Sequence, residues 1–500
     1  MTLLLQRRAI SASIALVFLV TTSFFTTTGQ APDPAARLVT RAAGNTPLIE
    51  DVRELCDRIG GRPTGSPECR RAVEWGMQAF GYVGVDKLAT ETFNVPNLWL
   101  GRSATASCVV PETFSLRIAA APFSPSTPGG RPLQRQLVDA GDGSAEAFAK
   151  LGSSAKGAIA LVRSQEMKTL DDLFLEYLRN GPVVEAAKKA QVAALLLQST
   201  RPRGLLYRHP INLTSNPAPF PVAIIAREQA SRLLRLAERH VVALSLSIDN
   251  QIGGPYEARN VVAEIRGSER PNEIVLLGAH LDSWDLGTGA NDNGINAALV
   301  IDVARGIKSL GIRPRRTIRF VLFTGEEQGM WGSAGYVKTH AAELDQHAAV
   351  VIFDIGSGRT EGFYLNGRDE LRRTVEEALR PVRGKRVWSN PLDGIDGTDN
   401  FDFLLAGVPN LVANQNALPY LPDYHAESDV FDAVDIKEAK NNDGIAAALV
   451  WGLANSPNSP LRRQTRGEVE KLLHDTKLDE QMKAFDQWDD WVNGKRGISK

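Results

Sequence analysis

Short apolar runs alternate with helical patterns from residue 260 onward. Residues 274–278 form an unbroken apolar run closed by glycine, which is typical of a strand buried on both faces of a sheet. Similar runs cover residues 261–265, 317–323 and 349–353, and residues 294–308 show helical periodicity. Strands and helices that alternate in this way predict an α/β fold.

The pattern changes between residues 122 and 252. Prolines and glycines cluster at residues 122–130, which indicates a domain boundary. Shorter strands and one helical run that leads directly into a strand follow, at residues 157–162, 220–225 and 184–197. No catalytic constellation is evident in this segment, and we interpret His209 and His240 as ordinary surface or core residues.

Beyond Pro460 the sequence is that of a polar helix with one apolar seam. The seam consists of Leu478, Met482, Phe485, Trp488 and Val492. We expect this tail, residues 461–500, to pack on the body of the protein or against a second copy of the chain, as a homodimer.

The N-terminus has the layout of a secretory signal peptide. Arg7 and Arg8 precede an apolar run over residues 10–25, and small residues follow at 29–31. The alternative is an uncleaved membrane anchor, but the run is short for a full span and no second apolar segment follows. We therefore expect a signal peptide over residues 1–31, a secreted or periplasmic protein, and no stable membrane insertion after cleavage.

The three cysteines, at positions 56, 69 and 108, matter because an exported protein meets oxidising surroundings. In an oxidising compartment they predict one disulfide and one remaining thiol. Cys56 and Cys69 lie on two predicted helices joined by a turn rich in glycine and proline, and they are the favoured pair. Buried free cysteines are the alternative. The spacing supports neither a zinc–thiolate cluster nor a catalytic cysteine.

Length and charge narrow the class of protein further. A chain of 500 residues suggests more than one domain and is long enough to bury a stable core. Its 57 basic and 58 acidic residues give a formal net charge of -1. Such a balance gives no reason to expect a nucleic acid or an anionic membrane surface as partner.

Histidines and carboxylates follow the predicted strands at the points where the strands end. In open α/β sheets ligands bind at the carboxyl ends of the strands, and imidazole with carboxylate suits zinc. Taken singly, each of these residues is more often part of a solvated turn. Together they offer the ligands of a two-metal hydrolytic site. They are His280, Asp282, Asp285, Asp292, Glu326, Glu327, Asp354 and His425.

On these motifs the chain resembles the zinc exopeptidases of family M28, most closely their carboxypeptidase Q branch. The matching pieces are residues 278–285, 289–294, 326–329, 354, 397–401, 406–409 and 424–425. Residues 122–252 resemble a protease-associated domain, a small β-rich module inserted in several exopeptidases. The resemblance implies a mixed central β-sheet flanked by helices. It also implies a catalytic domain made of residues 32–121 and 253–460, interrupted by this insert.

The resemblance also implies a set of metal ligands. His280 and Asp354 would hold one zinc ion, and Glu327 and His425 would hold a second. Asp292 would bridge the two ions.

Two further carboxylates would serve catalysis. Glu326 would be the general base, and Asp282 would orient His280 by accepting its imidazole N–H. Thr398 and Asp399 are expected to lie near the site. In this branch the last ligand motif is often rich in histidine, whereas Tyr424 precedes a single histidine here.

The implied function is that of a secreted dizinc exopeptidase, a metallo-hydrolase. It would cleave dipeptides or short peptides with free termini through a metal-activated water. One alternative is an enzyme similar to glutaminyl cyclase, which typically uses a single zinc. Another is a non-catalytic receptor on the same fold, although such a chain is expected to lose ligands or the base.

Overall fold

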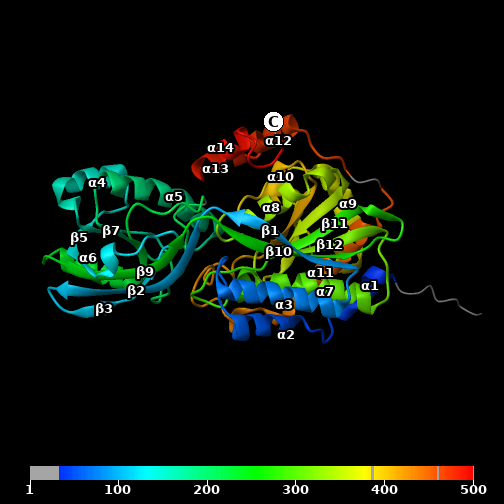
Figure 1. The fold of residues 1–500 in the computed structure, drawn as a ribbon, viewed down its shortest axis with the longest axis horizontal. Helices are drawn as coiled ribbons and strands as arrows, with labels where there is room; N and C mark the ends of the chain where they lie inside the picture. Colours follow the sequence, from blue (N-terminus) through cyan, green and yellow to red (C-terminus); the bar gives the residue numbers. More distant parts are fainter. Residues whose placement is uncertain (1–32, 213, 385–387, 459–460, 499–500) are drawn as a thin grey trace, which may run out of the picture. The chain divides into compact units, whose positions relative to one another are not determined.

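The predicted apolar runs form strands of a seven-stranded mixed sheet in a computed structural model of the protein (Figure 1). The strand order is β1 (Lys87–Val95), β10 (Tyr256–Ile265), β12 (Arg316–Phe323), β11 (Arg270–His280), β13 (His347–Ile352), β15 (Asn410–Gln415) and β14 (Thr360–Tyr364). The strands β12, β11, β13 and β15 are parallel, and antiparallel strands flank them. The predicted mixed α/β fold is confirmed.

The structure describes residues 33–500 except 213, 385–387, 459–460 and 499–500. The predicted signal peptide, residues 1–31, therefore lies outside the described residues. Residues 34–500 form one compact unit. In the part of the chain that is described, no helix combines the length and the apolar character that a membrane span requires.

Strand β11 is buried on both faces because helices cover both sides of the sheet (Figure 1). Val275 and Leu277 point to one face and Leu276 to the other, as the two-residue period of a strand requires. The first face carries α1 (Pro34–Ala42), α2 (Leu48–Glu54), α3 (Pro67–Val83), α7 (Ile295–Ser309), α9 (Arg372–Ala378) and α11 (Ile436–Asn455). The second face carries α8 (Trp331–Thr339) and α10 (Asn400–Leu405).

A second sheet contains eight strands. Its order is β3 (Phe114–Leu116), β2 (Leu98–Val110), β9 (Ala243–Gly253), β5 (Leu133–Asp139), β6 (Ile159–Val162), β7 (Ala194–Gln198), β8 (Val222–Ile225) and β4 (Ile118–Ala120). Helix α5 (Leu170–Lys189) packs on one face and α6 (Arg227–Ala237) on the other, while α4 (Ala145–Leu151) contributes Phe148 to the α5 side. This sheet begins at Leu98, before the predicted boundary at residue 122. The domain boundaries stay a prediction.

The tail is helical, as predicted, but it forms three short helices in place of one. They are α12 (Arg466–Asp475), α13 (Leu478–Ala484) and α14 (Trp488–Val492). Lys477 and Asp486 separate them with φ values of 60° and 57°, which a right-handed helix cannot contain. Leu478 and Met482 pack with Phe401 of α10, so this part of the seam contacts the body of the same chain.

All three cysteines are free and buried, which contradicts the predicted Cys56–Cys69 bridge. Cys56 packs into the core beneath α7, whereas the Sγ of Cys69 lies 3.9 Å from the hydroxyl of Thr64. Burial raises the pKa of the Cys69 thiol to about 12. The alternative of buried free cysteines is the one that the structure contains.

We expect Leu277→Ala to lower the free energy of unfolding by about 2–5 kcal/mol, because it removes a fully buried side chain from the central strand. Urea unfolding followed by circular dichroism measures the change. Leu418→Ala is the matched control: Leu418 is 66% exposed, and its loss should change stability by no more than about 0.5 kcal/mol. Equal effects of the two substitutions would contradict the placement of β11 at the centre of the core.

Candidate active site

The candidate metal ligands and the candidate base lie together where the parallel strands end. Strand β11 ends at His280, Glu326 and Glu327 follow β12, and Asp354 follows β13. Because these neighbouring strands run parallel, their carboxyl ends lie at the same edge of the sheet. Asp292 reaches the same place from the loop that precedes α7.

Five side chains form two groups that could each hold a metal ion. In the first group, Nε2 of His280 lies 2.9 Å from Oδ1 of Asp354 and 3.2 Å from Oδ1 of Asp292. In the second, Nε2 of His425 lies 2.9 Å from Oε2 of Glu327 and 3.4 Å from Oδ2 of Asp292. Within each group the ligand atoms lie within 4.8 Å of one another, and all five residues are buried. Asp292 thus directs one oxygen to each group.

The second group has the hydrogen-bonding pattern of a cation site. Nδ1 of His425 lies 2.9 Å from the carbonyl oxygen of Arg208, which places the imidazole proton on that nitrogen. Burial lowers the pKa of His425 to about 4, so the ring is neutral and its Nε2 carries a lone pair. That lone pair faces the carboxylates of Glu327 and Asp292, whose buried oxygens there have no hydrogen-bond donor. Acceptors that face one another in this way fit a bound cation.

Glu326 stands apart from both groups. Its Oε2 lies 3.9 Å from Nε2 of His280, and it belongs to neither set of candidate ligands. Burial raises the pKa of Glu326 well above its usual range; His280 opposes this shift, and the charges of Asp354 and Glu327 add to it. A carboxyl group that is held beside the candidate ligands without belonging to them is suited to accept and return a proton.

Asp282 contacts His280 differently from the prediction. Nδ1 of His280 lies 3.0 Å from the backbone carbonyl of Asp282 but 3.6 Å from its carboxylate, which is too long for a hydrogen bond. The reason is that Thr64 holds the carboxylate: its hydroxyl donates to Oδ2 of Asp282 at 2.8 Å. The same hydroxyl accepts the N–H of Gly325, directly before Glu326. The ring of His280 is therefore oriented by the main chain.

Comparison with known proteins identifies the family. The family model for peptidase family M28 matches residues 260–450. Carboxypeptidase Q of Mus musculus is 31% identical over 405 residues, which cover 80% of this chain and 83% of that relative. The chain belongs to peptidase family M28. This membership confirms the predicted resemblance and the predicted enzyme class, a metallopeptidase, and it supports zinc as the metal.

Two solved structures agree with the assignment to M28. A peptidase M28 precursor from Shewanella amazonensis SB2B has a TM-score of 0.77 at 26% identity, over 86% of this chain and 98% of that chain. BSAP, a zinc aminopeptidase from Bacillus subtilis, has a TM-score of 0.64 at 20% identity, over 82% of this chain and 95% of that chain. At that identity the second structure shows the fold alone.

In this M28 chain the strand ends are not sufficient to build the second group of candidate ligands. Residues 206–208, which follow the second sheet's strand β7, pair with the loop that carries His425. The N–H of Arg208 donates to the carbonyl of His425 at 2.9 Å, and the N–H of Glu427 donates to the carbonyl of Leu206 at 3.0 Å. The guanidinium of Arg208 also pairs with Asp285, at 2.8 Å. Sequence analysis missed Arg208 because its contact with His425 is made by a backbone carbonyl.

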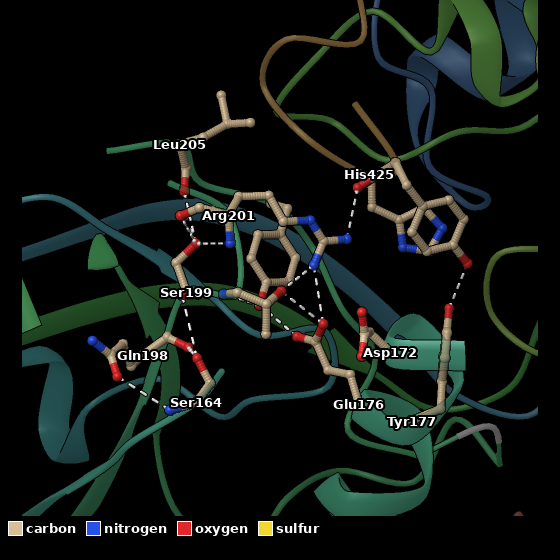
Figure 2. Close-up of polar contacts among 12 residues, drawn as sticks. Ser164, Asp172, Glu176, Tyr177, Gln198, Ser199, Arg201, Leu205 and His425 are labelled. Atoms are coloured by element: carbon tan, nitrogen blue, oxygen red, sulfur yellow. Dashed lines mark hydrogen bonds and ion pairs between the residues drawn. The ribbon is translucent and has the colours of Figure 1, made fainter. Parts of the chain in front are cut away.

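A buried ion pair also holds the loop that carries His425 (Figure 2). Nη1 of Arg201 donates to Oε2 of Glu176 at 3.0 Å, and its Nη2 donates to the carbonyl of Tyr424 at 3.4 Å. The hydroxyl of Tyr177, on α5, lies 2.6 Å from that of Tyr424. The Tyr424 ring in turn stacks on His425, with centroids 3.7 Å apart. The segment that contains α5 therefore fixes the position of a candidate ligand.

The two histidines of the predicted insert differ in their surroundings. His240 is exposed, whereas His209 is fully buried. The His209 ring lies 4.0 Å from Tyr177 and 6.4 Å from His425, measured between centroids. His209 is a core residue as interpreted, but no sequence motif indicates that it packs beside the site.

We expect Thr64→Val to lower the free energy of unfolding by about 1–3 kcal/mol, because Asp282 loses a donor and Gly325 loses an acceptor in a buried site. Thr64→Ser keeps the hydroxyl and is the matched control, with a smaller effect. Guanidinium unfolding of the three proteins measures the difference. If both variants lost the same stability, the hydroxyl would not be the group that links the two loops.

Proposed function

We propose that the protein is a secreted dizinc exopeptidase that hydrolyses dipeptides or short peptides with free termini. The observation that carries this proposal is the position of Asp292, which directs one carboxylate oxygen to each of two buried ligand groups. Membership of family M28 supports the reaction class. The similarity to carboxypeptidase Q supports cleavage at a free terminus, and the predicted signal peptide supports the secretion.

The residues present fit two zinc ions. His280 and Asp354 would hold one, Glu327 and His425 the other, and Asp292 would bridge them. When bound, the ions would supply Lewis acidity, lowering the pKa of a water molecule and polarising the scissile carbonyl. The carbonyls of Asp282 and Arg208 would keep the two imidazoles turned toward the ions.

Glu326 would move the proton. During attack the water oxygen forms a bond to the carbonyl carbon, and Glu326 accepts the proton that the water loses. As the carbon–nitrogen bond breaks, Glu326 returns that proton to the departing amine. Burial and the charges of the neighbouring carboxylates raise the pKa of Glu326, which makes its carboxylate a stronger base for this exchange.

Metal analysis tests the ion count. Purified protein should contain two zinc ions per chain, and a chelator should abolish hydrolysis of unblocked dipeptides until zinc is returned. Full activity with a single tightly held zinc, on N-terminal glutaminyl peptides, would indicate a cyclase instead. Protein that binds two zinc ions and hydrolyses no peptide would indicate a receptor.

The adjacent pair Glu326 and Glu327 separates catalysis from metal binding. Glu326→Gln should retain both zinc ions while kcat falls by about 10²–10⁴, the usual contribution of a general base. Glu327→Gln replaces a candidate ligand with a neutral amide and should lose one zinc ion. Elemental analysis and dipeptide kinetics on both variants measure the two effects. The opposite pattern would exchange the two roles, and wild-type rates in both would place catalysis elsewhere.

A further inference from the structure

The candidate site opens into a cavity of about 420 Å³ that extends beyond the metal-binding residues. One wall is formed by α5, through Leu170, Leu173 and Phe174. Another is formed by the C-terminal tail, through Gln481 and Phe485. All of these wall residues lie outside residues 260–450, the part of the chain that the family model matches.

The two walls meet in an aromatic contact. The rings of Phe174 and Phe485 lie 5.6 Å apart at an interplanar angle of 66°, and those of Tyr177 and Phe485 lie 6.2 Å apart at 73°. These are the edge-to-face arrangements that aromatic rings prefer. Helices α5 and α13 thus come together over the cavity, as their neighbouring positions in Figure 1 indicate.

The tail that carries Phe485 is fixed to the loop that carries the candidate base. Nη2 of Arg496 pairs with Asp402 at 2.7 Å, with both side chains nearly buried, and it donates to the carbonyl of Gly329 at 3.2 Å. Met330, next to Gly329, packs with Leu478 and Met482 of α13. These contacts therefore fix the position of the aromatic wall relative to the candidate site.

The cavity wall carries several carboxylates. Among the described residues that line it there is no lysine or arginine, and two carboxylates besides those of the metal groups and Glu326 contribute, from Asp171 and Asp396. An acidic substrate side chain that packs against this wall would meet no lysine or arginine, at the cost of desolvating a charge. An apolar side chain would instead bury its surface against the rings and aliphatic residues.

We propose that Phe174 and Phe485 are specificity-determining residues, which select substrates with a large apolar side chain beside the scissile bond. This inference rests on the proposed function, because it names the substrate class of the same site. The tail is then part of the substrate pocket, in addition to packing on the body. Acidic residues at that position of the substrate are excluded.

Kinetics on a small dipeptide panel test the inference. The panel is X-Ala and Ala-X, with X as Phe, Leu, Ala or Glu. For X at one of the two positions, wild-type protein should show a kcat/KM for Phe or Leu about 10-fold or more above that for Ala, the discrimination that an apolar pocket provides. With Glu as X at that same position, the peptide should not be cleaved measurably. Phe485→Ala and Phe174→Ala should each reduce the ratio of kcat/KM for the Phe or Leu peptide to that for Ala-Ala about 5–10-fold.

Two further variants complete the design. Tyr82→Ala removes an aromatic ring that is 91% exposed and should leave the panel unchanged. Phe485→Leu keeps an apolar wall and should retain most of the preference, which separates selection from folding. If the phenylalanine variants kept the wild-type preference, or lost activity equally on all peptides while Phe485→Leu did so too, the inference would be overturned. If zinc-loaded wild-type protein cleaved no dipeptide, the proposed function itself would fail.

Discussion

The arrangement of this protein depends on one carboxylate, that of Asp292. Its two oxygens lie 3.2 Å from His280 and 3.4 Å from His425. To complete the two candidate ligand groups that share it, the ends of β11, β12 and β13 and a loop that follows β15 must converge within a few ångströms. The parallel centre of the sheet supplies the first three positions. The apolar layers on either face of β11 keep those strand ends from moving apart.

The fourth of these segments, the loop that carries His425, is not positioned by the parallel strands. His425 lies on a loop outside the sheet, and its orientation comes from Arg208 and from the contacts of Arg201 and Tyr177 with Tyr424. The eight-stranded sheet is therefore a structural component of the site, together with the seven-stranded one. The tail adds a third contribution, because Arg496 holds the loop that follows Glu326 and Glu327.

The sequence predicted those features that depend on local pattern. Unbroken apolar runs such as residues 274–278 identified the buried strands, and the residues after them met as parallel strands require. Features that depend on distant segments had no such signal. Arg208 orients His425 through a backbone carbonyl, which every residue possesses. The hydroxyl of Thr64 lies in a stretch whose glycines and prolines predict only a turn. Lys477 interrupts the tail with a positive φ that its side chain does not favour.

The bond between Arg208 and His425 joins residues 217 positions apart. A contact of such high sequence separation forms only after most of the chain has found its place, since the intervening segment must first lose its freedom. The first ligand group needs no such contact, because His280 ends one strand and Asp354 follows the strand beside it. The second ligand group is complete only when both sheets are in place, because Arg208 follows a strand of the eight-stranded sheet and Glu327 follows a strand of the seven-stranded one.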